Sequence, residues 1–199
     1  MIASIRGTLV SKSPTEVIVD AGGIGYSVNV PVSTFAVLGE VNGPVTLLTY
    51  LHVREDALQL YGFSSEDERS TFKLLISVSG IGPKMGQTIL SGITVPELRQ
   101  HILSGNFGAL TTIPGVGKKL AERIIVELRD KIGKTDTEQP LASSDRQSHL
   151  RSQALLALTS LGYSRVVAEK ALLAAARETG GEGISIEALI KASLRHTAK

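Results

Sequence analysis

The chain has 199 residues, 42% of them hydrophobic and 20% charged, which is typical of a folded globular protein with one large domain or several small ones. No stretch approaches the roughly 20 apolar residues of a membrane span, and the amino terminus lacks a secretory signal, so we expect a cytoplasmic protein without membrane association. The formal net charge of +2 is too small to indicate a nucleic-acid partner by itself, and the absence of cysteine excludes disulfides, cysteine-bound zinc and thiol nucleophiles.

Residues 1–63 contain short runs that are rich in β-branched residues and bounded by Gly, Pro, Ser or Asn, which is the pattern of β-strands. Five or six such strands predict a small closed barrel, with the OB-fold as the leading candidate. Residues 22–25 predict a turn, because they lie between two strands and no helix follows. The predicted strands are residues 2–6, 8–12, 16–20, 26–30, 45–51 and 58–63.

Aromatic residues are scarce in this predicted barrel. Barrels of this kind often bind oligonucleotides on stacked aromatic rings, but this chain has no tryptophan. We therefore expect most of the barrel's rings to lie in its core rather than on a stacking surface. These rings are Tyr26, Phe35, Tyr50, Tyr61 and Phe63.

Polar residues 52–57 separate the last two predicted strands and indicate a hairpin tip. The carboxylates of Glu55 and Asp56 could act in acid–base catalysis, bind a metal or keep the turn solvated. On a protein that binds DNA they could instead repel phosphates and limit where a strand passes. A metal is the weakest alternative, because only His52 lies at a supportive spacing, and we expect neither a metal nor a cofactor.

From residue 64 the apolar spacing becomes that of helices. Ser65 is placed to cap a first helix whose opening turn is acidic. This region is mildly basic, with nine basic against seven acidic residues over 64–133, whereas residues 1–63 carry three against five. The further predicted helices are residues 84–90, 95–104, 107–112 and 118–132.

Two segments of the helical region repeat one pattern with an offset of 35 residues. In each, an apolar run leads into a Gly-apolar-Gly turn and then a basic helix. The glycines permit positive φ and a close approach of the backbone, and the start of the new helix attracts phosphate. One such turn is weak evidence, but two in register predict binding to the DNA backbone. The matching pairs are Leu75 with Leu110, Val78 with Ile113, Gly86 with Ala121, Ile89 with Ile124, and Leu90 with Ile125.

Basic side chains follow both turns and strengthen this prediction. We expect backbone N–H groups after the turns to bind phosphates together with these side chains. The candidate phosphate-binding residues are Gly80, Gly82, Lys84, Gly115, Gly117, Lys118, Lys119 and Arg123.

The same glycines do not form a nucleotide-binding motif. In a P-loop, Thr112 would have to be the first glycine and Lys119 the magnesium-binding hydroxyl residue. A dinucleotide-binding fingerprint would need glycine where Leu120 stands, and a strand before the turn. We therefore expect no ATP hydrolysis by this chain.

Residues 134–148 are polar and nearly free of large apolar residues, which predicts a flexible linker. Residues 149–199 then predict a separate module of three helices, at about 150–161, 164–179 and 185–196. We interpret it as a tethered protein-binding module, with a merely structural extension as the alternative. Gly162 and Gly180-Gly181 are expected to end helices, and Ser164 and Ser185 to cap them. The expected core is Leu155, Leu158, Leu161, Val167, Ala171, Leu172, Ile186, Leu189 and Ile190.

The order of these parts resembles the RuvA family, the Holliday-junction-binding subunits of the bacterial branch migration complex. The resemblance covers nearly the whole chain, and its ordered set of segments is more specific than any single helix-hairpin-helix turn. One departure is Met85-Gly86, where the family pattern has Leu-Ala, and the glycine is expected to weaken its helix by up to about 1 kcal/mol. The matching segments are residues 53–57, 60–63, 80–84, 114–128 and 157–163.

The resemblance implies an α+β fold of several domains. These are an OB-fold barrel over residues 1–63, a tandem helix-hairpin-helix domain over 64–133, the linker, and a UBA-like three-helix bundle over 149–199. It also implies sequence-independent binding of four-way (Holliday) junctions, without catalytic activity, in recombination, DNA repair and the SOS response to DNA damage. The location would be the bacterial cytoplasm, in association with the nucleoid.

The resemblance further implies partners. A homotetramer, alone or as a face-to-face octamer, would hold the junction, with Glu55 and Asp56 as an acidic pin near its centre. Residues 149–199 would recruit RuvB, a hexameric ATPase, and the complex would cooperate with the RuvC resolvase.

Two other functions remain open from the residues. The first is a helix-hairpin-helix DNA repair nuclease or glycosylase that uses Glu55 and Asp56, although no catalytic constellation or base-flipping aromatic is evident in the helical region. The second is a single-strand binder that uses the barrel. A preference for single strands over junctions would favour the latter.

Overall fold

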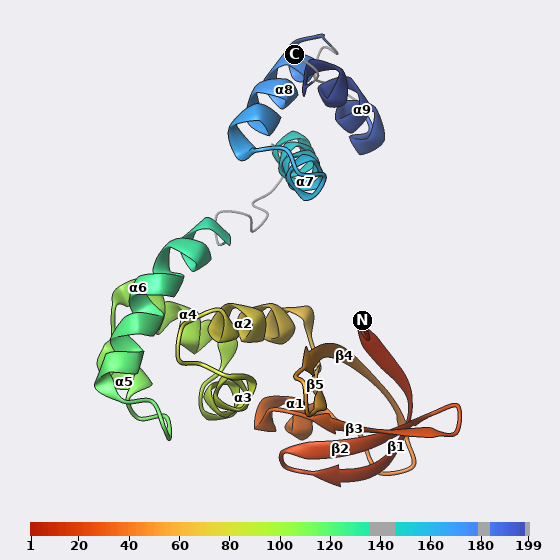
Figure 1. The fold of residues 1–199 in the computed structure, drawn as a ribbon, viewed down its shortest axis with the longest axis vertical. Helices are drawn as coiled ribbons and strands as arrows, with labels where there is room; N and C mark the ends of the chain where they lie inside the picture. Colours follow the sequence, from red (N-terminus) through yellow and green to blue (C-terminus); the bar gives the residue numbers. More distant parts are fainter. Residues whose placement is uncertain (136–145, 179–183, 198–199) are drawn as a thin grey trace. The chain divides into compact units, whose positions relative to one another are not determined.

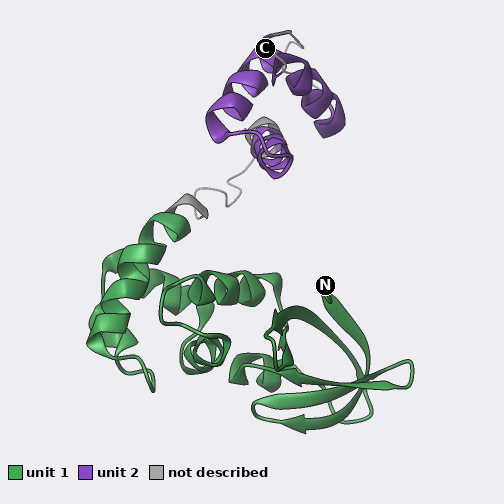
Figure 2. Ribbon diagram, viewed as in Figure 1, with its two compact units in different colours: residues 1–134 green, residues 135–199 purple. Residues whose placement is uncertain are grey.

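The computed structural model describes residues 1–135, 146–178 and 184–197. The chain divides into two compact units, residues 1–134 and 135–199, which Figure 2 shows in different colours. Among the described residues, no helix combines the length and the apolar character that crossing a membrane requires.

The first unit begins with a closed barrel of five strands. Figure 1 shows the barrel at one side of this unit and the helices α2–α6 beside it. The order of strands around the barrel is β1-β2-β3-β5-β4. All neighbouring strands are antiparallel except β3 and β5, which are parallel. The predicted barrel is confirmed. Its strands are β1 (Ser4–Ser13), β2 (Glu16–Ala21), β3 (Ile24–Asn29), β4 (Pro44–Val53) and β5 (Leu58–Phe63).

The structure corrects two details of the predicted barrel. The separate strands expected at residues 2–6 and 8–12 form the single strand β1, which continues through Gly7. A Cβ at this position would lie 1.9 Å from the carbonyl oxygen of Asp20 on β2, so the glycine permits close strand packing and does not end the strand. A short helix, α1 (Val32–Val37), also follows β3. Six residues are too few to show helical periodicity, and its N-cap, Pro31, has no capping side chain.

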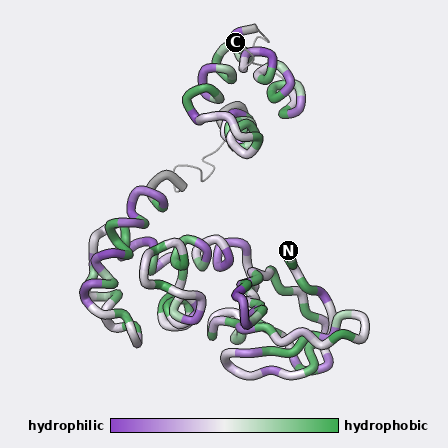
Figure 3. The backbone as a smooth tube through the Cα atoms, viewed as in Figure 1, coloured by the Kyte–Doolittle hydropathy of each residue, from purple (hydrophilic) through white to green (hydrophobic). Residues whose placement is uncertain are grey.

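The barrel core is aliphatic. The strands carry both hydrophobic and hydrophilic residues (Figure 3). Burial alternates along parts of β1, β2 and β4, as expected where every second side chain points inward, whereas the last four residues of β5 are all buried. As expected, the rings do not form an exposed stacking surface. Tyr61 and Phe63 are buried, and Tyr26 and Phe35 are partly buried against the barrel core. The barrel core consists of Ile5, Leu9, Val17, Val19, Val28, Val30, Val45, Leu47 and Leu60.

Five helices complete the first unit, as the sequence predicts, with ends that differ by a few residues. The Ser65 hydroxyl accepts a hydrogen bond from the N–H of Glu68 and caps the first of them. Thr94 and Glu97 form a capping box at the start of α4, and the hydrogen bonds from Thr94 lower the pKa of the Glu97 carboxyl. The helices are α2 (Glu66–Ile76), α3 (Pro83–Gly92), α4 (Val95–Ser104), α5 (Phe107–Leu110) and α6 (Lys118–Thr135).

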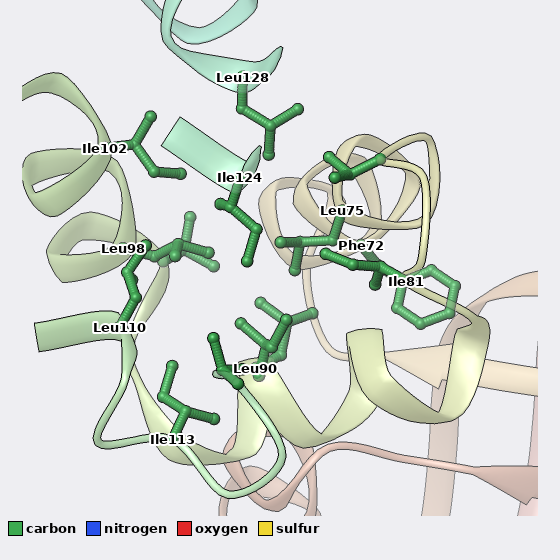
Figure 4. Close-up of a cluster of buried hydrophobic side chains, with 14 of the residues drawn as sticks. Phe72, Leu75, Ile81, Leu90, Leu98, Ile102, Leu110, Ile113, Ile124 and Leu128 are labelled. Carbon is green, nitrogen blue, oxygen red and sulfur yellow. The ribbon is translucent and has the colours of Figure 1, made fainter. Parts of the chain in front are cut away.

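These helices enclose one apolar core (Figure 4). Phe72 of α2 is fully buried and extends this core to the barrel, because its ring centre lies 4.9 Å from that of Phe63 and 5.2 Å from that of Tyr61. The buried residues that Figure 4 labels are Phe72, Leu75, Ile81, Leu90, Leu98, Ile102, Leu110, Ile113, Ile124 and Leu128.

Buried polar contacts also join the barrel to the helices. The Glu68 carboxylate of α2 is only 8% exposed and accepts hydrogen bonds from the hydroxyls of Ser33, Thr34 and Ser64 at 2.5, 2.6 and 2.9 Å. The side-chain amide of Gln87 on α3 donates to the carbonyls of Thr15 at 3.0 Å and Val30 at 2.7 Å. Since these bonds are made by buried or half-buried groups, they fix α2 and α3 against the barrel.

The second unit contains the three predicted helices, α7 (Arg146–Ser160), α8 (Arg165–Glu178) and α9 (Ile186–Thr197). Ser164 and Ser185 accept hydrogen bonds from the N–H groups of Val167 and Ala188, as N-caps do. Gly162 has a φ of +95° after α7, as expected for a helix end. The expected break at residues 180–181 lies outside the described residues.

The predicted core of this unit needs correction at two positions. Leu158, Ala171, Leu172 and Leu189 are buried, but Leu161 is 62% exposed because α7 ends one residue before it. Val167 is 40% exposed. The buried core instead includes small residues that the prediction omits, which are Ala154, Ala168 and Ala175.

The ends of the predicted linker are helical. Residues 134–135 continue α6, and residues 146–148 belong to α7. Residues 136–145, on which the rest of this prediction falls, lie outside the described residues.

Candidate nucleic-acid interface

The first candidate site is the turn between α2 and α3. We call α2, this turn and α3 hairpin 1. Gly80 has a φ of +91°, a conformation that side chains with a Cβ rarely adopt, and Gly82 is the N-cap of α3. Val78 and Ile81 are buried beneath the turn, whereas Ser79 and both glycines are exposed. Two apolar side chains therefore anchor the turn while its glycine backbone faces solvent.

Hairpin 2, which consists of α5, α6 and the turn between them, repeats this geometry. Gly115 has a φ of +83°, and the side chains of Ile113 and Val116 are buried. The N–H of Val116 donates to the Ile113 carbonyl at 3.0 Å, just as the N–H of Ile81 donates to the Val78 carbonyl at 3.1 Å. The two turns predicted from the repeat are therefore structurally equivalent.

Each turn leads into a helix whose start is suited to an anion. Gly82 provides no side-chain cap, and neither α3 nor α6 has an acidic residue in its first turn. The first N–H groups of a helix have no partner within it and attract negative charge. Lys84, Lys118 and Lys119 are exposed beside these helix starts, and the Lys118 ammonium lies 5.7 Å from the centre of the Phe107 ring.

The two hairpins contact each other. The Arg123 guanidinium of α6 donates a hydrogen bond of 2.8 Å to the carbonyl of Ser79 in the turn of hairpin 1. The Lys131 ammonium, further along α6, donates to the Ser77 hydroxyl at 3.1 Å. Sequence reasoning assigned Arg123 to phosphate alone and missed its contact with hairpin 1, because the two residues are 44 positions apart.

Replacing Arg123 by alanine is expected to loosen the turn of hairpin 1. A hydrogen bond from a charged but exposed group contributes about 1 kcal/mol, so amide hydrogen exchange at residues 79–81 should become about fivefold faster. Exchange measured by mass spectrometry on the protein without DNA checks this. Arg129→Ala, which removes another exposed arginine of α6, is the matched control. Equal exchange in both variants would contradict the role of the Arg123 contact.

The departure from the family pattern at residues 85 and 86 has a place in this packing. A Cβ on Gly86 would lie 3.1 Å from the Phe72 ring and 3.2 Å from Ile76, so the glycine lets α2 and α3 pack closely. A Cβ on Gly115 would lie only 2.7 Å from the terminal methyl of Met85, so the Met85 side chain contacts the turn of hairpin 2. Met85 therefore adds an apolar contact between the hairpins.

The predicted hairpin tip lies between β4 and β5. The N–H of Arg54 donates to the Ala57 carbonyl at 2.9 Å and closes the tip, and the side chains of Glu55 and Asp56 are exposed. The described residues contain no cluster of three or more side chains that could hold a metal. The structure thus presents the two carboxylates to solvent.

Sequence reasoning also missed a groove between the barrel and hairpin 1. It has a volume of about 790 Å³ and is lined by residues from β3, β4, β5 and α3. Its walls converge only in the folded protein, so no local motif indicates it. The Arg54 side chain reaches back into this groove, where its Nε donates to His52 Nε2 at 3.1 Å.

A closed barrel joined to two equivalent helix-hairpin-helix turns defines a class of proteins that bind the sugar-phosphate backbone of DNA. Residues 1–62 match the family model of the RuvA N terminal domain, residues 72–130 that of the SAM-like helix-hairpin-helix tandem, and residues 150–198 that of the RuvA C-terminal domain. The chain belongs to the RuvA family.

Relatives support this membership over the full length. The chain is 46% identical to a protein of Chloroherpeton thalassium over 98% of both chains, and 45% identical to one of Solibacter usitatus, also over 98% of both. It is 49% identical to a protein of Bordetella pertussis over 86% of this chain and 88% of the other. Each of these proteins is named Holliday junction branch migration complex subunit RuvA. The predicted family and fold class are confirmed.

Proposed function

We propose that this protein binds four-way DNA junctions without reading their sequence and acts as the non-catalytic, junction-recognising subunit of a branch migration complex. The observation that carries this proposal is the pair of equivalent hairpins, each with an exposed glycine turn and a lysine beside the start of a helix whose first turn has no acidic residue. Family membership supports it, because the relatives bear the name of that complex.

In this proposal the hairpins bind phosphate rather than bases. Backbone N–H groups that follow Gly82 and Gly117 bind phosphate oxygens, and Lys84, Lys118 and Lys119 add positive charge. Such contacts position a duplex but carry no sequence information. Arg123 contributes both by its charge and by holding the hairpin 1 turn in place.

Selection of a junction over a linear duplex then arises from symmetry. In a homotetramer, four pairs of hairpins at fixed angles are all occupied only when four arms are present, so the binding energies add for the junction alone. Two tetramers facing each other would enclose it. The exposed carboxylates of Glu55 and Asp56 form an acidic pin that repels phosphates near the crossover and keeps exchanging strands apart.

The partners follow from the same proposal. The three-helix module within residues 149–199 recruits the RuvB motor, a hexameric ATPase, while the RuvC resolvase acts on the same junction in recombination and repair. Exposed apolar side chains on this module, including Leu156 at 70% and Leu173 at 57% exposure, offer a surface for a protein partner.

A competition experiment tests the proposed function. A labelled four-way junction is bound to the protein and challenged with unlabelled linear duplex, single strand or junction of equal length, while light scattering gives the mass of the free protein. We expect a tetramer that releases the junction only to junction competitor. A monomer that binds junction and duplex equally well would overturn the proposal, and cleavage or base release in the presence of Mg²⁺ would indicate a repair enzyme instead.

Neutralising the acidic pin should separate binding from migration. The double variant Glu55→Gln with Asp56→Asn is expected to keep its junction affinity within about threefold, since exposed carboxylates repel phosphate and do not bind it. The rate of motor-driven migration should change. Fluorescence anisotropy and a strand-displacement assay measure the two quantities. Loss of folding in this variant would show that the carboxylates are structural.

Removal of residues 149–199 should leave junction affinity unchanged, because residues 1–134 form a compact unit that contains both hairpins. Stimulation of the motor's ATPase activity should be lost. The binding titration and a phosphate-release assay check the two expectations, and stimulation that survives the deletion would contradict the role of the module.

A further inference from the structure

The groove between the barrel and hairpin 1 lies outside the contacts of the proposed function. One wall includes His52, Arg54 and Gln59 of the barrel, and the other includes Lys84, Gln87 and Thr88 of α3. The groove is about 790 Å³ in volume. It begins at Gly82 and Lys84, which are already assigned to phosphate, and extends to the base of the hairpin tip, so it is continuous with the hairpin 1 surface.

The charge of the groove is one-sided. Lys84 and Arg54 face it from opposite walls together with His52, and no carboxylate lines it. Arg54 donates to His52, and none of the ion pairs among the described residues involves Arg54 or its neighbours Glu55 and Asp56. The guanidinium therefore lies on the groove side of the tip, whereas the two carboxylates next to it are exposed at the end.

Neutral groups add hydrogen-bond donors to the same walls. The Tyr61 hydroxyl donates to Gln59 Oε1 at 3.1 Å, which leaves the Gln59 amide N–H groups for another acceptor. Burial raises the pKa of the Tyr61 hydroxyl, and the nearby Arg54 opposes this effect. Gln87 is bonded to two barrel carbonyls, so the two walls keep a constant separation.

We propose that this groove binds one sugar-phosphate strand of a DNA arm between hairpin 1 and the acidic pin, with Arg54 and Lys84 as its phosphate contacts. This inference rests on the proposed function and adds a third DNA contact to the two hairpins. A polyanion matches a groove that has cations on both walls and no acid, and arginine can donate two parallel hydrogen bonds to one phosphate.

The sequence order Arg54, Glu55, Asp56 then has a mechanical meaning. A DNA strand is attracted along the groove up to Arg54 and repelled by Glu55 and Asp56 immediately beyond it. The change from positive to negative charge therefore marks the point at which the strand must leave the arm. The barrel thus helps to determine where the strands part, and does not only support the hairpins.

Thiol cross-linking tests this placement directly, because the chain has no natural cysteine. Thr88→Cys places one thiol in the groove, Ser79→Cys one in the turn of hairpin 1, and Ser11→Cys one on an exposed part of β1 outside the groove. Each variant is mixed with four-way junctions that carry a thiol-reactive tether on a single phosphate at successive distances from the crossover. The Thr88→Cys variant is expected to cross-link to phosphates nearer the crossover than those that react with Ser79→Cys, and Ser11→Cys should form no cross-links.

The outcomes separate the groove from the proposed function. Cross-links to the hairpin 1 thiol of Ser79→Cys without any to the groove thiol of Thr88→Cys would overturn the groove while leaving junction binding by the hairpins intact. Cross-links to neither thiol would overturn both. Protection of the groove thiol by the motor protein in the absence of DNA would identify the groove as a protein-binding surface and also overturn the proposal.

A salt titration provides a second measurement. Arg54→Gln is expected to flatten the dependence of log Kd on log salt by about 0.9 for each subunit that contacts the junction. Arg6→Gln is the matched control, since Arg6 is an exposed barrel arginine bonded to Thr46 outside the groove. Equal slopes for the two variants would overturn the phosphate contact of Arg54.

Discussion

Replacing Lys118 and Lys119 together by alanine is expected to weaken binding both to four-way junctions and to linear duplexes, by about a hundredfold at 0.1 M salt for each bound subunit. Each phosphate contact contributes about 0.9 to the slope of log K against log salt, which is about tenfold between 1 M and 0.1 M. The slope itself should fall by about two for each bound subunit, since two lysines are removed. Fluorescence anisotropy at several salt concentrations measures both quantities.

The matched control keeps the charge and changes only the side chain. Lys118→Arg with Lys119→Arg should bind with nearly the normal slope, since arginine also neutralises a phosphate. Both side chains are exposed, so neither double variant should unfold the protein, and circular dichroism checks this. Unchanged affinity of the alanine variant would contradict the assignment of hairpin 2 to DNA.

The variant Phe72→Ala is expected to lower the free energy of unfolding of the first unit by about 3–5 kcal/mol. The Phe72 side chain is fully buried and contacts rings of two barrel strands, at distances of 4.9 Å to Phe63, 5.2 Å to Tyr61 and 5.5 Å to Tyr50 between ring centres. Its removal leaves a cavity where the barrel meets the helices. Since typical domains have only about 5–15 kcal/mol of stability in total, this variant should unfold at a much lower urea concentration.

Urea denaturation followed by circular dichroism measures this destabilisation. Val126→Ala is the control, because Val126 is an apolar residue of the same unit but 76% exposed, and its truncation should change stability by less than about 0.5 kcal/mol. Phe72→Leu should lie between the two. Equal midpoints for Phe72→Ala and Val126→Ala would show that the ring cluster does not couple the barrel to the helices.

The hairpins could be predicted because their conformation makes local demands on the sequence. Gly80 and Gly115 both have positive φ, and the buried residues around them recur at the same offset. Any chain that forms this turn twice must show the pattern twice. The basic residues beside the turns could be predicted for the same reason, since they are neighbours in sequence.

The remaining parts depend on contacts between distant residues. The partner of Arg123 is a backbone carbonyl of the other hairpin, and the Glu68 carboxylate is satisfied by hydroxyls of α1, a helix that was itself not predicted. Neither contact leaves a periodic signal. Leu161 shows the opposite case, in which a sequence signal is present but misleading. Its spacing along the sequence fits a buried core position, but α7 ends before it, so the side chain is exposed.

The bonds that join the two hairpins have a consequence for the geometry of the DNA that they accept. Arg123 and Met85 hold one turn at a constant distance from the other. Under the proposed function, the phosphates that the two turns bind must therefore be separated by one fixed spacing. A-form duplexes have a wide and shallow minor groove, so under the proposed function we expect an RNA–DNA hybrid arm to fit the two turns less well than a DNA arm. The protein would thereby sense the helical form of each arm while remaining indifferent to its bases.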